Sequence, residues 1–500
     1  MPIIGPIFRV TFKLNVYPAV WKNSITLVLR KPARASYSKP SSFRPIALLD
    51  TIGKILSACV AEDLSNFAET HNLLPPNHFG CRPGRTTTDA IHYVAAQIKD
   101  AWRKGEVVSA LFLDIKGAFP SVKLNRLIHN MRKRGIPKQY TDWIRSKVMY
   151  RSTQLVFDDY ISPQETLHCG IDQGCPLSGI LFLFYNADLL EITCSANGEG
   201  SVAVVDDATI LAKGADLKET TKKLVEIMNR QNGLLTWSRS HGCEFALNKF
   251  ALIGFTRRRT PDETRKGKTK PILRPSIEID GHVIESSTTH KFLGVHIDQE
   301  LRFKEQTAEA LRKGTKWIEQ YKHLAKTMKG VSAKHMMKFY YTIALPKMLY
   351  AADVFLIPES NTTKGTVGFI RNLARIHRQA LIAITGALKT TATNIMEMHA
   401  HVPTFKALLK DKLHREATRF ACLPKTHPLY KTVCKAARRY VKRHRAPIHE
   451  LLHAFDLNPL QMEKIAPVSR GPKWAPRHRT RIHHDKSKAI EELDNCFGTR

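Results

Sequence analysis

The most constraining feature of the chain is a pair of adjacent aspartates between two apolar runs. Asp206 and Asp207 follow the apolar residues 203–205 and precede the largely apolar run 208–211. This pattern predicts a β-hairpin that carries two carboxylates at its tip. Adjacent carboxylates repel one another, and a hard cation that takes oxygen ligands, Mg²⁺ first among them, would neutralise them. The alternative is a solvated Asp-Asp turn without any ligand.

A second apolar run, upstream, also ends in a carboxylate. Residues 110–113 are apolar, Asp114 follows them, and the segment 115–119 leads through Lys-Gly toward a helical stretch. Two such strands can lie side by side in one sheet, which would bring Asp114 and Asp206 to the same point. Together they could hold two metal ions, the arrangement that clamps the attacking and leaving oxygens in phosphoryl transfer.

These stretches resemble the palm of a reverse transcriptase, and more closely the polymerase of a non-LTR (LINE-type) retrotransposon, with a likeness to fungal elements. The matching pieces occur in family order over roughly residues 15–395. The resemblance implies an α+β fold, a right-hand polymerase with fingers, a ferredoxin-like palm and a helical thumb, followed by a basic C-terminal extension. It also implies that Asp114, Asp206 and Asp207 are catalytic. Asp114, Asp206 and the Ile115 carbonyl would hold two Mg²⁺ ions, for which Mn²⁺ would substitute.

The resemblance divides the chain into four expected parts. Residues 1–105 would form an N-terminal segment and the fingers, and residues 106–300 the palm with finger insertions and a primer-grip hairpin. Residues 301–424 would form the helical thumb and a connector, and residues 425–500 a flexible basic tail. Apolar periodicity predicts helices near 51–75, 123–150, 217–241, 370–384 and, in two patterns broken at Gly330, 303–360. Asp280-Gly281 predicts a tight hairpin turn.

Two basic residues of the expected fingers are candidates for binding the incoming nucleotide. By resemblance, Lys31 and Arg44 grip its triphosphate; otherwise they are surface cations of a very basic protein. Phe119 lies five residues after Asp114, where the family places an aromatic ring beneath the sugar. A ring there would collide with a ribose 2′-hydroxyl and so select dNTPs. The alternative for Phe119 is an ordinary core aromatic.

Residues 170–178 match the family element Gly-x-x-Gln-Gly-x-Pro-Leu-Ser. Gln173 would contact the templating base pair, and Gly174 would let the backbone approach it closely. Two positions depart from the expected pattern, Asp172 and Cys175, and a carboxylate at 172 close to a triphosphate would repel substrate. The aspartate hairpin departs too, because Val204 stands where Tyr or Phe is usual.

Further candidates concern the template, the primer and the leaving group. The Gly/Pro-rich loop 77–90 resembles a fingers motif, so Arg82 and Arg85 would lie along the template strand; the alternative is a capped turn without a ligand. Lys249 matches a lysine that donates a proton to the leaving pyrophosphate or stabilises its charge, although a surface lysine explains it equally well. The run 291–295 resembles the primer grip, which would comprise Phe292, Leu293 and Gly294.

Composition supports a polyanionic partner. Lys and Arg outnumber Asp and Glu by 78 to 44, so the formal net charge is +34, which favours nucleic acid through phosphate neutralisation. No stretch approaches ~20 uninterrupted apolar residues, and no signal peptide is evident. The nine cysteines form no C-x-x-C pair, so we expect a reduced, intracellular location in the nucleus or cytoplasm.

Absent motifs suggest a polymerase section of a longer element or a truncated copy. We expect neither an endonuclease domain before the fingers nor a ribonuclease H domain after residue 400. Other element-encoded domains or proteins would then be partners. Histidines of the C-terminal region invite a zinc interpretation, but without paired cysteines a flexible basic tail is favoured; they are His444, His449, His453, His478, His483 and His484.

The function predicted from the sequence is RNA-directed DNA polymerisation. A primer 3′-hydroxyl would attack the α-phosphorus of a dNTP on an RNA or DNA template. The expected partners are an RNA template, a DNA primer or target DNA, and dNTPs, with no membrane. One alternative is a decayed retrotransposon fragment that only binds nucleic acid. Another is a group II intron maturase or a related cellular reverse transcriptase, against which the connector at 370–391 argues.

Overall fold

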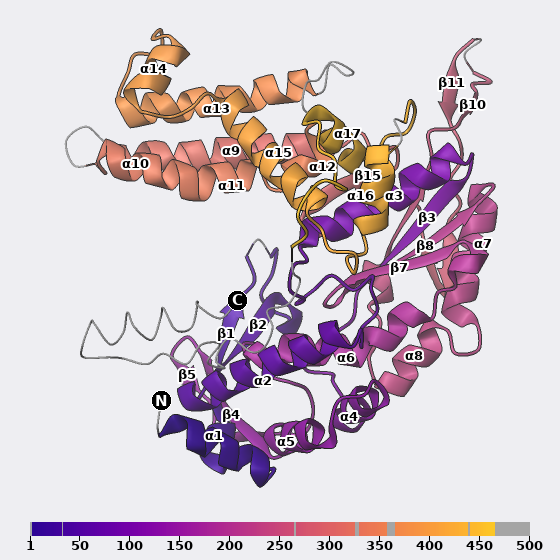
Figure 1. The fold of residues 1–500 in the computed structure, drawn as a ribbon, viewed down its shortest axis with the longest axis vertical. Coiled ribbons are helices and arrows are strands. Elements are labelled where there is room, and N and C mark those ends of the chain that lie inside the picture. Colours follow the sequence, from indigo (N-terminus) through magenta and orange to yellow (C-terminus); the bar gives the residue numbers. More distant parts are fainter. Residues whose placement is uncertain are drawn as a thin grey trace, which may run out of the picture.

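The computed structural model describes residues 3–32, 34–264, 267–325, 330–357, 366–438 and 441–465. Its parts follow a C-shaped path in Figure 1. A five-stranded sheet with its helices lies at the lower left, a four-stranded sheet lies at the right, and a helical layer runs along the top. The predicted α+β class is confirmed, with the parts arranged as expected for fingers, palm and thumb.

The four-stranded sheet is the ferredoxin-like palm. It has the order β7-β8-β3-β9, with all neighbours antiparallel. The helices α6 and α7 complete a βαββαβ motif, into which the fingers strands β4, β5 and β6 are inserted. Its elements are β3 (Val107–Leu113), α6 (Pro176–Glu191), β7 (Glu199–Val204), β8 (Asp207–Gly214), α7 (Leu217–Asn229) and β9 (Ala251–Phe255). Every residue of β3 is buried, as its unbroken apolar sequence requires for a central strand.

The five-stranded sheet forms the fingers. The strands β1 (Asn23–Arg30) and β2 (Phe43–Leu49) pair antiparallel, and β1 also pairs in parallel with β4 (Arg151–Phe157). Two short strands, β5 (Tyr160–Ile161) and β6 (Glu165–Leu167), complete it. Of the neighbouring helices, α1 (Ile4–Lys13) packs on α5 (Lys138–Val148) and α2 (Thr51–Thr70) packs on α6. The helix predicted near 51–75 is α2. Its buried stripe includes Leu56, Val60 and Leu64, whereas Ile52 and Ile55 are exposed.

Two predicted long helices are each divided in the structure. The segment 123–150 forms α4 (Leu124–Lys133) and α5 (Lys138–Val148), separated at Gly135, which has a positive φ, and Pro137. The segment 217–241 forms α7 and α8 (Leu234–His241), separated at Gly233. Glycine and proline interrupt a helix more strongly than apolar periodicity extends it.

Three short hairpins follow the palm sheet. They are β10 (Arg259–Pro261) with β11 (Thr269–Pro271), β12 (Ile277–Ile279) with β13 (His282–Ile284), and β14 (Thr289–Phe292) with β15 (Val295–Asp298). The predicted turn at Asp280-Gly281 is confirmed, and both residues have the positive φ that a tight hairpin requires.

The helical layer above the palm is held to α3 (Thr87–Arg103) by buried ion pairs. His92 lies 2.6 Å from Asp353, and Arg419 lies 2.6 Å from Asp89. The layer comprises α9 (Lys304–Leu324), α10 (Ala333–Phe339), the π-helix η5 (Tyr340–Ala344), α11 (Leu345–Met348), α12 (Ala352–Phe355), α13 (Val367–Thr385), α14 (Thr393–His399) and α15 (Phe405–Ala421). The helix predicted near 370–384 is α13, and the break predicted at Gly330 adjoins residues outside the described part of the chain.

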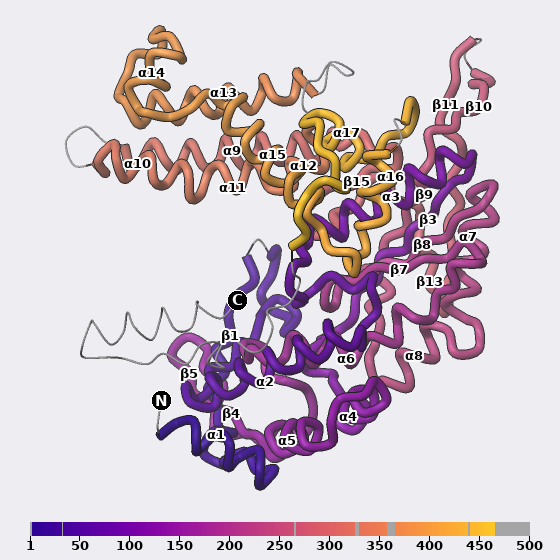
Figure 2. Tube along the Cα trace, in the orientation of Figure 1, coloured from indigo at the N-terminus to yellow at the C-terminus, as the bar shows by residue number. Residues whose placement is uncertain are grey.

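Part of the region expected to be a flexible tail from residue 425 is helical. Figure 2 shows α16 (Tyr430–Arg438) and α17 (Pro447–Ala454), in yellow, returning to α3. Ile448, His449 and Leu451 are buried. Short apolar runs therefore suffice to anchor this segment, although its basic composition predicted a solvated tail. No set of three His, Cys, Asp or Glu side chains suited to a metal occurs in the described ranges. His478, His483 and His484 lie outside the described residues.

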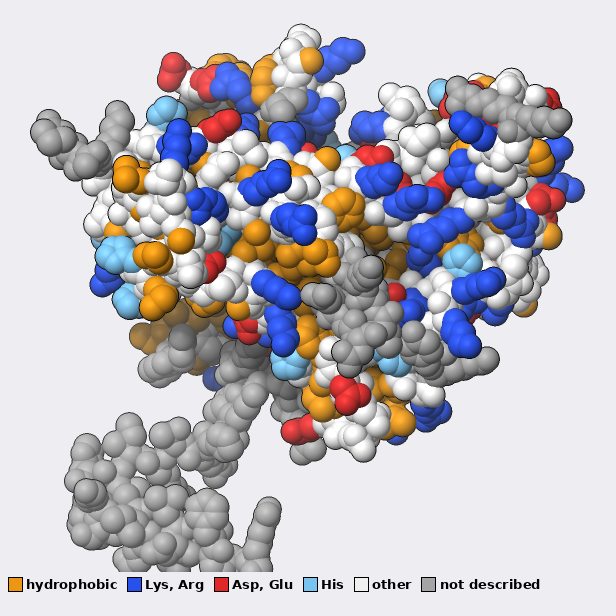
Figure 3. Space-filling view, turned by 90° about the horizontal axis from the view of Figure 1, so that it is seen from above, with side chains coloured by type: hydrophobic (Ala, Val, Ile, Leu, Met, Phe, Trp, Pro, Cys, Tyr) orange, Lys and Arg blue, Asp and Glu red, His pale blue; other side chains and the backbone are white. Residues whose placement is uncertain are grey.

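The surface of the helical side carries much positive charge. Figure 3 looks onto this side and shows Lys and Arg side chains spread over it, with fewer Asp and Glu. Among the described residues, no helix has both the length and the apolar character needed to cross a membrane.

Candidate active site

The sheet register brings the three predicted carboxylates to one end of the palm. Val204 pairs with Asp207 across the β7–β8 turn, and Leu113 of β3 pairs with Ala208 of β8. Asp114, one residue beyond Leu113, therefore lies beside Asp207. Asp206 occupies the turn itself. The two apolar runs predicted from the sequence are thus neighbouring strands, and both end at the same edge.

The carboxylates at this edge repel one another and are partly dehydrated. Desolvation raises the pKa of Asp206, and the nearby Asp114 raises it further. Desolvation, followed by the charges of Asp206 and Asp114, raises the pKa of Asp207 to about 6. Asp206 and Asp207 still reach solvent, so a cation has access to oxygens whose negative charge is under-compensated.

One cationic side chain already faces the cluster. Lys249, in the 3₁₀ turn Leu247–Lys249, places its Nζ 2.5 Å from Asp114 Oδ2. Its turn is fixed by the hydrogen bond from the Ala246 amide to the Asp114 carbonyl, 2.9 Å long. A positively charged group therefore partly balances the site where the sequence predicts metal ions.

The donor set fits a hard divalent cation. Mg²⁺ usually binds through one or two carboxylates, keeps several waters and also uses substrate phosphates, so it needs no cage of protein ligands. Asp114 and Asp206 supply such carboxylates. Ile115 lies opposite Phe245 in an isolated antiparallel bridge, and the hydrogen bonds that flank it use the Asp114 carbonyl and the Lys116 amide. The Ile115 carbonyl is not used by these bonds and remains a candidate ligand.

The predicted triphosphate residues lie near this cluster. Arg44 is exposed, and its side chain forms no hydrogen bond or ion pair with another described residue. It is close enough to Asp206 to act on the pKa of that carboxyl. Partial burial lowers the pKa of Lys31, and Arg34, Arg44 and Lys249 lower it further. Lys31 donates to the Ser41 carbonyl at 3.0 Å. Positive side chains from the fingers thus converge beside the carboxylates.

The loop with Gln173 and Gly174 joins the fingers to the palm. The Ala47 amide of β2 donates to the Gln173 carbonyl at 2.8 Å. Gly174 has a φ of +119°, and a Cβ there would lie 2.8 Å from the Ala47 carbonyl oxygen, so only glycine fits. Phe119 is tied to the same loop because its carbonyl accepts from the Ile171 amide at 2.9 Å. Its half-buried ring packs on Phe182, with centroids 5.3 Å apart.

Asp172 is buried inside the protein, whereas its sequence position suggested a carboxylate close to the triphosphate. Its carboxylate is buried and paired with Arg151, whose guanidinium also donates to the carbonyls of Val148, Cys169 and Gly170. The charge of Asp172 is therefore neutralised inside the protein, and the pair ties the Gln173 loop to β4. Cys175, the other departure, is buried at the start of α6.

Arg82 and Arg85, which the sequence places along the template strand, are engaged in contacts within the protein. Arg82 forms a double hydrogen bond with Glu69 and donates to the Pro75 carbonyl. Arg85 donates to the carbonyls of Pro76 and His78, and both guanidinium side chains are almost wholly buried. Their contacts hold the loop 75–85 in shape.

The predicted primer-grip residues form the turn of the β14–β15 hairpin. Leu293 and Gly294 have positive φ values, as the turn requires. Phe292 is buried and packs on Phe112 of β3, with centroids 5.3 Å apart. The hydroxyl of Tyr350 in the helical layer donates to the Leu293 carbonyl at 2.9 Å. The hairpin is therefore fixed to the strand that carries Asp114.

Asn186, which contacts the aspartate turn, and His78, which contacts Asn186, were not predicted. Asn186 of α6 donates to the Val205 carbonyl at 2.6 Å, and its other amide atom contacts His78. The only sequence signal was a polar residue within a very apolar helix. His78 carries no such signal, because the contact joins segments distant in sequence.

Comparisons with known proteins identify the family to which the chain is similar. The reverse transcriptase (RNA-dependent DNA polymerase) family model matches residues 29–297. A probable RNA-directed DNA polymerase from the Drosophila melanogaster transposon X-element is 24% identical over 351 residues, covering 70% of this chain and 37% of the relative. The RNA-directed DNA polymerase from the D. melanogaster mobile element jockey is 23% identical over 432 residues, covering 86% of this chain and 44% of the relative.

The solved structures include telomerase from Candida tropicalis without ligand. It is 12% identical, with a TM-score of 0.40 and coverage of 90% of this chain and 73% of that one.

Because the family model covers more than half of the chain, the chain belongs to the reverse transcriptase family. Its relatives from transposons and mobile elements confirm the predicted likeness to non-LTR retrotransposon polymerases. The fungal likeness stays a prediction, since these two relatives are insect proteins. The chain spans less than half of the length of either relative. Members of this family generally use divalent metal ions.

Proposed function

We propose that this chain is an RNA-directed DNA polymerase that transfers a nucleotide from a dNTP to a primer 3′-hydroxyl. The observation that carries the proposal is the meeting of Asp114, Asp206 and Asp207 at one edge of a ferredoxin-like sheet. Arg44, Lys31 and Lys249 adjoin that edge. Carboxylates beside cationic side chains suit a reaction in which a triphosphate binds between them.

Each group has a distinct role in this proposal. Arg44 and Lys31 bind the triphosphate and orient it, which lowers the entropic cost of an in-line reaction. Asp114 and Asp206, with the Ile115 carbonyl, would hold two Mg²⁺ ions, which supply an activated 3′-hydroxyl and compensation of phosphate charge when bound. Lys249, released from Asp114, donates a proton to the pyrophosphate or balances its charge.

The remaining predicted residues would recognise the sugar, the base pair and the primer. Phe119 would bar a 2′-hydroxyl, and Gln173 with Gly174 would contact the templating pair. The hairpin at Phe292, Leu293 and Gly294 would hold the primer end, and the net charge of +34 favours an RNA template with a DNA primer or target. Arg82 and Arg85 act on the template indirectly, by shaping their loop.

Burial of the Asp172 charge weakens the main reason to regard the chain as a fragment that only binds nucleic acid. The two functions differ in a primer-extension assay. Purified protein is given a DNA primer on an RNA template with dNTPs and Mg²⁺, then Mn²⁺, beside Asp114→Ala. Extension that Asp114→Ala abolishes supports the polymerase. Salt-sensitive binding by the wild type without extension under either metal would contradict it.

A further inference from the structure

The turn that carries Asp206 is conformationally strained. Val205 has a φ of +59°, a left-handed conformation that a β-branched residue rarely adopts. The strain sets the direction in which the backbone leaves β7, and so the position of the next residue, Asp206. A strained conformation persists only when its surroundings hold it.

Two buried side chains hold this turn from the side of the palm core. Asn186 Nδ2 donates to the Val205 carbonyl at 2.6 Å, and Asn186 Oδ1 lies 3.2 Å from His78 Nε2. Since the amide nitrogen is used on Val205, its oxygen accepts, and His78 must carry its proton on Nε2. Burial lowers the pKa of His78 to about 3, so this ring is neutral.

The loop that carries His78 also contacts the turn through its backbone. The Phe79 amide donates to the Ala203 carbonyl at 2.8 Å, and the Ala203 amide donates to the Asn77 carbonyl at 3.2 Å. A Cβ on Gly80 would lie 2.5 Å from the Val205 nitrogen. The loop is therefore pressed against the turn, and its side chain at 78 can fix the Asn186 amide with little freedom.

We propose that His78 and Asn186 are positioning residues, which fix the strained Val205 turn so that Asp206 meets the metal and the substrate. The proposal rests on the proposed function, because it assigns these residues a task in the same site. Neither side chain is expected to touch substrate. Asn186 acts through the Val205 carbonyl, and His78 acts through Asn186.

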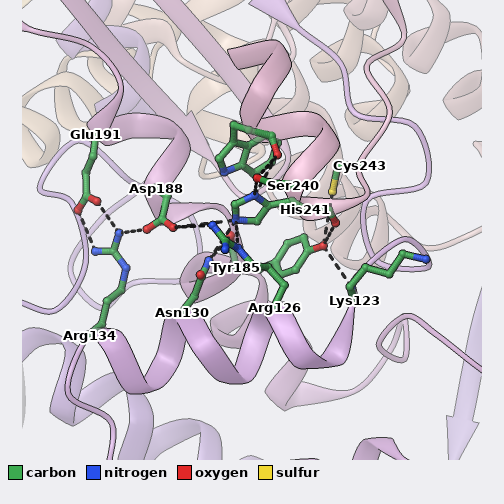
Figure 4. A network of polar contacts seen from close by, with 11 residues as sticks. Lys123, Arg126, Asn130, Arg134, Tyr185, Asp188, Glu191, Ser240, His241 and Cys243 are labelled. Atoms are coloured by element: carbon green, nitrogen blue, oxygen red, sulfur yellow. Dashed lines mark hydrogen bonds and ion pairs between the residues drawn. The ribbon is translucent and has the colours of Figure 1, made fainter. Parts of the chain in front are cut away.

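The test separates positioning from general stability. Asn186→Leu and His78→Leu remove the hydrogen bonds, whereas His78→Gln keeps an N–H donor at a similar reach. Asn130→Leu is the matched control, because Asn130 is a buried asparagine that donates to α6 at the Tyr185 carbonyl, 3.1 Å away, within the network of Figure 4. It contacts no residue of the aspartate turn. Asn186→Ala and His78→Ala serve wherever a leucine variant is not recovered folded.

Mn²⁺ binding to the free protein, followed by electron paramagnetic resonance, provides a readout besides activity. We expect the Asn186 and His78 removals to weaken Mn²⁺ binding about tenfold or more, as loss of a partner that orients a ligand does. The rate of nucleotide addition should fall while the KM for primer–template stays constant. His78→Gln should recover most of the Mn²⁺ affinity and most of the rate of nucleotide addition. Asn130→Leu should lower only thermal stability.

Two results would overturn the proposal. If Asn186→Leu lowers stability as Asn130→Leu does but keeps wild-type Mn²⁺ affinity and turnover, the residues are merely structural, and the proposed polymerase function stands. If wild-type protein binds Mn²⁺ no better than Asp206→Asn and extends no primer, the proposed function itself fails, and the positioning role with it.

Discussion

The ammonium of Lys249 and the carboxylate of Asp114 lie 2.5 Å apart at the edge of the palm sheet. Both side chains are substantially exposed, at 59% and 37% of their surfaces. An exposed ion pair of this kind contributes little, about 0–1 kcal/mol, because water screens it. Lys249 is thus a counter-ion that a divalent cation can displace at small cost.

The first prediction follows from this pair. In Lys249→Met, Asp114 loses its counter-ion, so free protein should bind Mn²⁺ up to about fivefold more tightly, as a pair of ~1 kcal/mol allows. Primer extension should nevertheless slow, because the leaving pyrophosphate loses its proton donor. Isothermal titration and extension assays measure the two effects. Weaker Mn²⁺ binding in the variant would show that Lys249 does not compete with the metal.

The second prediction concerns Phe119 and sugar selection. Phe119→Ala should raise incorporation of ribonucleotides relative to deoxyribonucleotides by about tenfold or more, since a steric filter on one hydroxyl is removed. Single-nucleotide addition with matched rNTP and dNTP substrates gives the ratio. Some stability should also be lost, because the ring packs on Phe182. An unchanged ratio in a folded variant would leave Phe119 as a core aromatic only.

The third prediction concerns the buried pair of Arg151 and Asp172. Asp172→Ala should lower the free energy of unfolding by about 3–5 kcal/mol, because it leaves a buried guanidinium without its partner. The double variant Arg151→Met with Asp172→Leu should be less destabilised than that. Chemical denaturation measures both. Asp172→Asn should leave the KM for dNTP unchanged, and a marked fall in that KM would mean that Asp172 does repel substrate.

The fourth prediction concerns pH. Burial lowers the pKa of His241 to about 4, and the charge of Arg126 adds to this. In Figure 4 its Nε2 faces Asn130 and Arg126, which donate to it at 3.2 Å. An unfolded histidine titrates near about 6.5. The contribution of the neutral His241 ring to the free energy of unfolding is therefore fully present above about pH 6.5, and it is lost as the pH falls toward 4.

We therefore expect the Tm to be lower at about pH 5 than at about pH 7. His78, His377 and His449, whose pKa values burial lowers to about 3, 4 and 4, act in the same direction. His241→Gln should lower the Tm at neutral pH and reduce its dependence on pH. A pH profile as steep in His241→Gln as in the wild type would assign the acid sensitivity to other groups.

The strands and their terminal aspartates were predictable because their pattern is local. An apolar run that ends in Asp114, and another that ends in Asp206, define both the strands and the edge where they meet. The glycine turn at Asp280-Gly281 was predictable for the same reason. Each depends on residues within a few positions of one another.

The parts that were not predictable depend on contacts between distant segments. The sequence position of Asp172 suggests that its carboxylate repels substrate, whereas in the structure this loop residue pairs with Arg151 of β4. The sequence suggests that Arg82 contacts backbone phosphates, whereas in the structure its guanidinium pairs with Glu69 of α2. The hold of Asn186 and His78 on Val205 likewise joins three separate segments. The periodicity of apolar residues along the chain does not indicate which polar side chains from distant segments will pair.

The most direct test of the account compares two aspartates in primer extension on an RNA template. Asp206→Asn removes a carboxylate charge from the site. Asp216→Asn makes the same change at the exposed N-cap of α7, where the side chain accepts from the Glu219 amide at 2.9 Å and asparagine caps equally well. The account predicts that Asp206→Asn abolishes extension while primer–template binding persists, and that Asp216→Asn extends as the wild type does. Extension by Asp206→Asn at the wild-type rate would contradict it.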